Sequence, residues 1–300
     1  MRALLTKYPK NSYWPPHPHY FIQPQRRVSP TISIETLQIL LASIVGGIWV
    51  GSTTYTAKRL GSGAGGLIGG LPAISAVSYL FIGLNQSPQN ASRAAYAFPI
   101  GLTITFLYLL VYASLASHGF KIAFLSALTT WLLLAAVDAI LNLPTLIPPS
   151  ILPIPIFLLG LYVLKVRLKL PYTPGVPIKP SRKEFLRRVI LGGGVVGAAV
   201  TISQLGGPLL GGVAAAFPGI FSTTIYSTYE AETDKTEGVR VSRALTKPLM
   251  ISAMITAYPY SLIVTWAYAN IGIVEGTILA FAGGIFCALF AYLLISRKKI

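Results

Sequence analysis

Apolar stretches of about twenty residues, separated by short polar or basic breaks, recur from residue 36 to the C-terminus. A helix of roughly that length crosses a hydrocarbon core of about 30 Å. The composition agrees, since 53% of the residues are hydrophobic and only 11% are charged, whereas ordinary domains carry about a quarter charged residues. The sequence therefore predicts an all-α membrane protein. We expect nine spans, at residues 36–56, 63–84, 94–116, 120–142, 146–165, 187–205, 208–229, 245–269 and 272–296.

The net charge of +16 allows two interpretations. A basic soluble protein would suggest nucleic acid, but here Lys and Arg lie between and beyond the apolar stretches, as they do where charge encodes topology. We therefore expect membrane lipids, and not nucleic acid, as partners. With the N-terminus outside the cell membrane, 18 of the 24 Lys and Arg residues fall on the cytoplasmic side, together with the C-terminus. Arg26 and Arg27, close to the first span, argue for the opposite orientation.

The chain contains an internal repeat. An offset of 146 residues aligns positions 44–74 with 190–220 without a gap and gives ten identities in 31 positions, seven of them glycine or proline. Farther on, Ser92-Arg93-Ala94 matches Ser242-Arg243-Ala244. Each copy covers four spans, and a single span lies between them. An odd number of crossings separates equivalent points, so the second copy enters the membrane upside down, a recurrent plan of secondary transporters.

The predicted organisation follows from this parity. It comprises about nine transmembrane helices, as two inverted four-helix repeats joined by a linking helix. We expect an extended basic tail over residues 1–30, the first repeat over 31–143, a linking span with a basic cytoplasmic loop over 144–186, and the second repeat over 187–300.

One stretch of the first repeat, AKRLGSGAGGLIGGLPAISAVSYLFIGL, resembles the GlpM-like group of small four-span membrane proteins. The resemblance covers residues 44–142 and, more weakly, the second repeat; it rests on the Gly-Gly and Leu/Phe-Pro signature after a small-residue loop. It implies that single units pair in opposite orientations, a state that fusion through the fifth span would fix here. It implies no particular biochemical activity.

Proline interrupts equivalent spans of the two repeats, at Pro72 in the second span and Pro218 in the seventh. Proline removes a backbone donor, so we expect carbonyl groups to be released at Ile68 and Ala214, and in lipid such groups need a partner or a wet cavity. Paired Gly/Pro interruptions in inverted halves point to a substrate site. The alternative is that both kinks only shape helix packing.

Hydroxyl residues follow each proline at helical spacing. Ser75 and Tyr79 follow the first proline, and Ser222 and Tyr226 follow the second, so each set shares a face with its proline. We expect these four residues, together with the prolines, to bind a small polar solute or an ion. Alternatively, their hydroxyl groups form hydrogen bonds with neighbouring helices.

Charged residues inside the spans are rare, as their cost in lipid requires. Asp138 has apolar neighbours on both sides and is predicted either to carry a proton or a cation or to pair with a nearby cation. Arg93 and Arg243 occupy matching positions at opposite membrane faces. Either arginine is expected to pair with an anionic group or substrate, or to extend to the lipid headgroups.

Other chemistry is not indicated. The sequence has no Walker A motif, its GxGxxG matches at 61–66 and 192–197 are explained by packing, and its three histidines lack metal-site spacing. No nucleophile, base and orienting acid stand together, so we predict no enzyme activity, no cofactor and no metal. Four acidic residues in the loop 230–237 are expected to be solvated and to balance nearby cations.

The sequence thus favours a secondary transporter or permease for a small solute, with a site at the interface of the inverted repeats. The alternative is a non-transporting membrane scaffold or assembly subunit. A permease needs a polar cavity between the second and seventh spans, whereas a scaffold would fill that volume with packed side chains. The solute, the coupling ion and the oligomeric state are left open.

Overall fold

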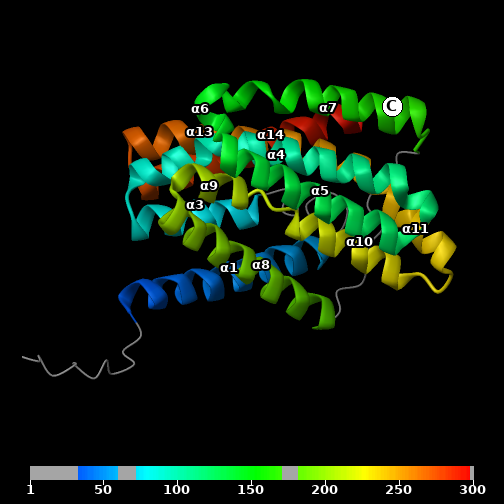
Figure 1. Ribbon diagram of the computed structural model, residues 1–300, viewed down its shortest axis with the longest axis horizontal. Coiled ribbons are helices and arrows are strands. Elements are labelled where there is room, and N and C mark those ends of the chain that lie inside the picture. Colours follow the sequence, from blue (N-terminus) through cyan, green and yellow to red (C-terminus); the bar gives the residue numbers. More distant parts are fainter. Residues whose placement is uncertain (1–32, 60–71, 171–181, 298–300) are drawn as a thin grey trace, which may run out of the picture. The chain divides into compact units, whose positions relative to one another are not determined.

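A computed structural model describes residues 33–59, 72–170 and 182–297, and all regular elements of these ranges are helical (Figure 1). The elements are α1 (Ile34–Arg59), α3 (Ala73–Asn85), α4 (Pro88–Leu115), η1 (Ala116–His118), α5 (Phe120–Leu141), α6 (Leu143–Leu146), η2 (Pro149–Ile151), α7 (Pro153–Tyr162), η3 (Val163–Arg167), α8 (Arg182–Gly206), α9 (Pro208–Ala214), α10 (Gly219–Ala231), α11 (Lys235–Ala244), α12 (Thr246–Ile255), α13 (Ala257–Asn270) and α14 (Ile273–Arg297).

Eight helical segments of the described residues are long and apolar enough to cross a membrane. They are Ile34–Thr53, Pro88–His118, Phe120–Leu141, Pro149–Arg167, Arg182–Gly206, Pro208–Ala231, Lys235–Asn270 and Ile273–Phe290. The chain is therefore a multi-pass helical membrane protein. Of the predicted second span, 63–84, α3 forms the latter part and residues 63–71 lie outside the described residues.

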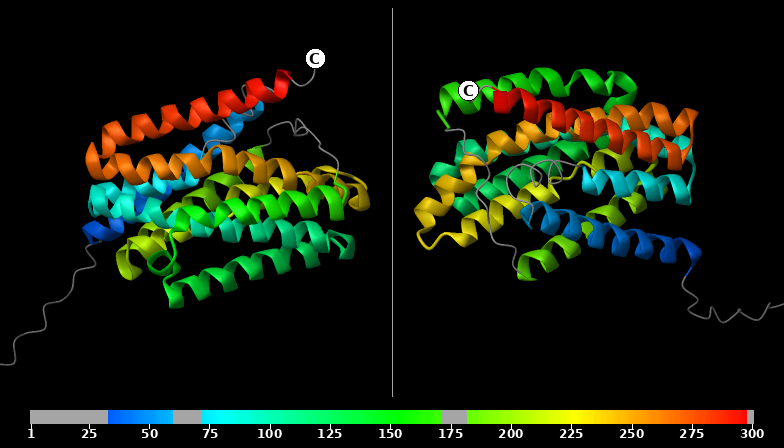
Figure 2. Two further views of the ribbon diagram at one scale, coloured as in Figure 1. Left: turned by 90° about the horizontal axis from the view of Figure 1, so that it is seen from above. Right: turned by 180° about the vertical axis from the view of Figure 1, so that it is seen from behind.

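Helix α4 forms the centre of the helical assembly (Figures 1 and 2). In its most apolar window 78% of the residues are buried inside the protein, against 17% for α5 and 22% for α14. It packs against α3, α5, α7, α9 and α13. The outer helices expose large apolar side chains such as Leu133, Ile140 and Phe286, which suits contact with lipid.

Helices α1 and α8 cross each other in close, antiparallel contact. A Cβ atom at Gly46 would clash with Val196, and one at Gly192 would clash with Val50. Each of these four residues has its counterpart at an offset of 146, so the two contacts are reciprocal. Small residues allow the helices to approach to this extent.

A second reciprocal pair of contacts lies beside the first. A Cβ atom at Gly47 would clash with the carbonyl oxygen of Val189, and one at Gly193 with that of Ser43. Val189 and Ser43 are again separated by 146 positions. Because backbone atoms block these two positions, only glycine fits where the helices cross.

Candidate functional site: a cavity between two proline breaks

Helices α3 and α10 begin in the same way. Each has 13 residues, and each has a proline as its N-cap, Pro72 with φ −77° and ψ 65° and Pro218 with φ −75° and ψ 42°. In both, the proline carbonyl accepts the first helical hydrogen bond, from Ala76 N at 2.8 Å and from Ser222 N at 2.7 Å. Both prolines therefore lie at the start of a helix inside the protein, and Pro218 separates α9 from α10 instead of kinking one continuous helix.

The break before α10 spans residues 215–218, after α9 ends at Ala214. We expected the carbonyl of Ala214 to be released, but it accepts the backbone N–H of Phe217 at 3.0 Å. The chain turns back on itself here, so a local donor reaches this oxygen. The carbonyl of Ala216 has no such donor and accepts the Thr105 hydroxyl of α4 at 2.8 Å. Ile68, the other expected position, lies outside the described residues.

A cavity lies between the two breaks and has walls from α3, α4, α10, α12 and α13. The space open to the centres of water molecules is about 80 Å³, whereas one water needs about 10–15 Å³ on this measure. It is therefore large enough for several waters or a small solute. The residues that line it are Pro72, Ala73, Ile74, Ser75, Phe98, Leu102, Thr105, Ala215, Ala216, Phe217, Pro218, Ile220, Phe221, Ser252, Ala253 and Ala257.

The cavity wall is mostly apolar, with a few fixed polar groups. Thr105 donates to the Ala216 carbonyl and accepts the indole N–H of Trp131 at 3.0 Å, so its hydroxyl is held on both sides. Trp131 packs edge-on against Phe217, with ring centroids 5.0 Å apart. The Ser75 hydroxyl donates to the Pro72 carbonyl at 3.2 Å. No charged side chain of the described residues lines the cavity, which therefore suits a small uncharged molecule.

The six predicted binding residues separate into two groups. Pro72, Ser75 and Pro218 line the cavity. Tyr79 is fully buried one helical turn beyond Ser75, and its hydroxyl has no hydrogen-bond partner. Its ring packs edge-on against Phe98 of the cavity wall at 6.1 Å.

The other two predicted residues point away from the cavity. The Ser222 hydroxyl bonds that of Tyr108 in α4 at 2.9 Å. Tyr226 is 37% exposed, and the guanidinium of Arg187 lies over its ring, 5.1 Å from the centroid. For Ser222 the structure thus shows the expected alternative, a hydrogen bond to a neighbouring helix.

The matching arginines have different surroundings. Arg243 is half-buried and donates from Nε to the Ala113 carbonyl of α4 at 2.7 Å. Arg93 is exposed and lines a second pocket, together with Ala139, Asn142, Gly206, Gly207, Pro208, Leu209 and Leu210. Their chemistry therefore differs although their places in the repeat correspond.

Asp138 is fully buried, and neither carboxylate oxygen has a hydrogen-bond partner. We expected either a proton or cation carrier or a carboxylate paired with a nearby cation. Within the described part of the chain it forms no ion pair, because the other side chains at this end of α5 carry no positive charge.

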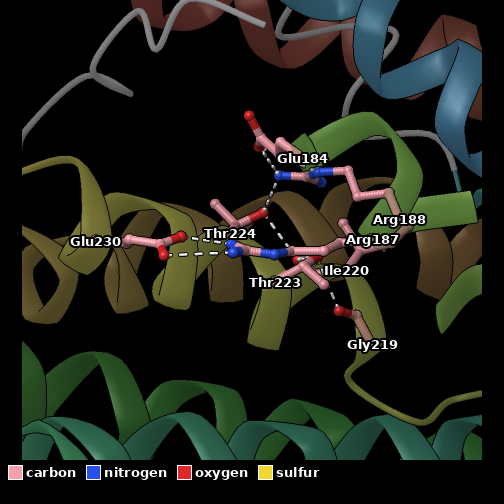
Figure 3. Close-up of polar contacts among 8 residues, drawn as sticks. All are labelled: Glu184, Arg187, Arg188, Gly219, Ile220, Thr223, Thr224 and Glu230. Atoms are coloured by element: carbon pink, nitrogen blue, oxygen red, sulfur yellow. Dashed lines mark hydrogen bonds and ion pairs between the residues drawn. The ribbon is translucent and has the colours of Figure 1, made fainter. Parts of the chain in front are cut away.

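A buried ion pair at the start of α8 was missed by the sequence analysis (Figure 3). Arg188 is 4% exposed and donates to Glu184 from Nε at 3.2 Å and from Nη2 at 3.0 Å. Nη2 also donates to the Thr224 hydroxyl of α10 at 3.1 Å. Glu184 and Arg188 have the i,i+4 spacing of a helical ion pair, and this spacing could have predicted their contact from the sequence. Glu184 had instead been assigned to the basic cytoplasmic loop, and Arg188 to the start of the sixth span.

Three acidic residues of the segment 230–237, which runs from the end of α10 into α11, form local contacts. Glu230 pairs with Arg187 (Figure 3), Glu237 pairs with Arg240, and Asp234 caps α11 by accepting the N–H of Thr236 at 2.8 Å. These contacts agree with the expected balance between this loop and nearby cations. The described residues hold no group of three or more His, Cys, Asp or Glu side chains placed for a metal ion.

Comparisons with protein-family models, with curated proteins and with solved structures find no match for this chain. The resemblance to the GlpM-like group therefore stays a prediction. The cavity between Pro72 and Pro218 is the candidate site for two reasons. It is large enough for a small solute, and both prolines of the repeated motif line it.

Proposed function

We propose that the protein is a secondary transporter or permease for a small uncharged solute, and that the cavity between Pro72 and Pro218 is its solute site. The observation that carries this proposal is that both proline breaks line one cavity. Helix breaks inside a membrane protein expose backbone groups that need partners, and they are tolerated where they line a cavity. A pure packing role would not require a shared space at this place.

We further propose that the chain consists of two inverted repeats. The reciprocal contacts of α1 and α8 support it, because a two-fold axis makes residue i meet j wherever the counterpart of j meets the counterpart of i. The cavity also takes equivalent residues from both copies, Pro72 with Pro218 and Ile74 with Ile220. In inverted-repeat transporters the site lies at the repeat interface, which is the place of this cavity.

We place the basic segment before α8 in the cytoplasm and the start of α1 outside, from the distribution of Lys and Arg. Labelling from outside should then modify a cysteine at Asn90 and spare one at Tyr172. The reverse result would invert the orientation without affecting the cavity.

Water access to the cavity tests the transport proposal. In protein reconstituted into vesicles, with the single cysteine Cys287 replaced by alanine, we would measure the reaction of Ser75→Cys with a membrane-impermeant thiol reagent. Ser78→Cys is the matched control, because Ser78 is buried in the same helix, does not line the cavity and bonds the Ile74 carbonyl. We expect Ser75→Cys to react and Ser78→Cys to stay unmodified.

A second variant in the same experiment tests the proline at the start of α10. Pro218→Ala restores the backbone donor and should allow α9 and α10 to join, which lowers the reactivity of Ser75→Cys and leaves membrane insertion intact. If Ser75→Cys is as unreactive as the control in the native background, the cavity is dry, and the scaffold alternative replaces the transport proposal.

A further inference from the structure

The side chain of Asp138 lies on the inner face of α5. The buried residues of this helix are Phe120, Ala123, Ala127, Trp131 and Asp138, at helical spacing. Leu132, Leu133 and Ile140 are exposed on the other side. Asp138 is thus an inward-facing carboxylate within a predicted membrane span, Phe120–Leu141.

No cation of the described residues forms an ion pair with this carboxylate. Among the described residues neither oxygen has a hydrogen-bond partner of normal length and angle, and the backbone N–H of Leu143 makes only a weak contact with it. Among the elements packed against α5, α9 has no titratable residue and η1 has only His118, at the opposite end of α5. At the near end of α4 the titratable residues are Arg93 and Tyr96, and both are exposed.

Burial without a partner favours the neutral acid. An ionised carboxylate taken out of water is very costly unless it is paired, and inside a membrane such groups mark proton or ion pathways. A metal cation would need several oxygen ligands, and the described residues hold no group of three or more His, Cys, Asp or Glu side chains placed for a metal ion. A proton satisfies the group by itself.

A route for the proton adjoins Asp138. The second pocket, lined by Arg93 and by the Asp138 neighbours Ala139 and Asn142, gives about 290 Å³ to the centres of water molecules, enough for many waters. It lies at the end of the helices where α5 and α8 end and α9 begins. Water in this pocket would therefore lie within one residue of the buried acid.

Asp138 also has a connection to the cavity. Trp131 lies seven residues earlier on the same face of α5, which corresponds to about 10 Å along the helix. Its indole holds Thr105, which in turn holds the Ala216 carbonyl at the proline break. A movement of α5 on protonation of Asp138 would reach the cavity wall through this chain of two hydrogen bonds.

We propose that Asp138 is a proton-binding residue that takes its proton from the pocket at Arg93 and couples proton binding to the conformation of the cavity. Its carboxylate accepts a proton from water and releases it in the conformation that hydrates the group. The coupling part rests on the proposed transport function, whereas the protonation of Asp138 does not.

Infrared spectroscopy of the reconstituted protein tests the proton site without any solute. A protonated carboxyl group gives a carbonyl band that shifts in heavy water. We expect such a band at neutral pH, its loss in Asp138→Asn, and its persistence in Glu275→Gln, which removes an exposed carboxylate. If the band is absent at neutral pH, or if it is unchanged in Asp138→Asn, Asp138 does not hold the proton and the proposal is wrong.

The coupling is tested by the reactivity of Ser75→Cys as a function of pH. We expect this reactivity to change over the pH range in which the infrared band titrates, and to lose that component when Asp138→Asn is added. The Glu275→Gln background should keep the pH-dependent component of the reactivity. Because the thiol ionises in the same way in this background, it also serves as the reference for the effect of thiol ionisation. The same pH profile with and without Asp138→Asn would overturn the coupling. Should Ser75→Cys never react, the transport proposal fails, while the infrared result still decides on the proton site.

Discussion

The first half of the chain, represented by α1 and α3, and the second half, represented by α8 and α10, share their backbone design. Both place two glycines where α1 and α8 cross, and both start a 13-residue helix with a proline at the cavity. At the glycines the reason is steric, since an added Cβ atom would not fit. The shared design therefore fixes how the helices approach one another.

The two halves differ in their polar side chains. Glu184, Arg188 and Thr224 form a buried network between α8 and α10, whereas the positions offset by 146 hold Gln38, Ala42 and Ser78. Ser78 donates its hydroxyl to Ile74 of its own helix. Side chains thus tie α10 to its neighbours, and the corresponding ties are missing for α3. The glycine contacts are thus common to the two halves, whereas the hydrogen bonds of their side chains differ.

The largest expected effect comes from breaking the ion pair that only the second half has. Arg188→Met removes the cation that pairs with the buried Glu184 carboxylate, and should lower the free energy of unfolding by about 3 kcal/mol. The double variant Glu184→Gln with Arg188→Met removes both charges, as in α1, and should recover most of the loss. Detergent-induced unfolding of the reconstituted protein measures both. A single variant as stable as the double one would show that the pair does not stabilise α8 and α10.

A smaller effect is expected where the halves are alike. Gly47→Ala and Gly193→Ala each push a Cβ atom against a backbone carbonyl, and each should cost about 2 kcal/mol. The same unfolding assay applies. Gly194→Ala is the control, because nothing lies within 4 Å of its added Cβ atom. A cost at only one of the two positions would contradict a reciprocal interface.

The smallest expected effect is that of one hydrogen bond from α10 to α4, formed by Ser222, whose counterpart in α3 at the offset of 146 is Ala76. In a double-mutant cycle, Ser222→Ala and Tyr108→Phe should show a coupling of about 0.6 kcal/mol, typical of hydrogen bonds between membrane helices. The cycle of Ser78→Ala with Tyr108→Phe should show none, because Ser78 bonds its own helix. Equal coupling in both cycles would remove this difference between the halves.

The placement of the hydroxyl residues shows the limit of helical periodicity as a predictor of which side chains line a cavity. Spacing of four residues put Pro218, Ser222 and Tyr226 on one face, yet each such step turns the direction by about 40°. Over two steps the direction changes enough for Tyr226 to reach the exposed side, next to Arg187, while Ser222 meets Tyr108. Periodicity gives a face only approximately, and the neighbouring helices decide which part of it is the cavity wall.

The sequence by itself determined that the chain is a multi-pass helical membrane protein and that a helix begins after Pro218. Both depend on properties of single segments, namely apolar length against the thickness of a bilayer and the missing backbone donor of proline. The tertiary structure decided which groups meet. The pairing of Arg188 with Glu184 and Thr224, the isolation of Asp138, and the closure of one cavity around Pro72 and Pro218 all depend on how separate helices pack. Packing sets the distance and direction between side chains that are remote in the chain, and these are the quantities on which hydrogen bonds, ion pairs and cavities depend.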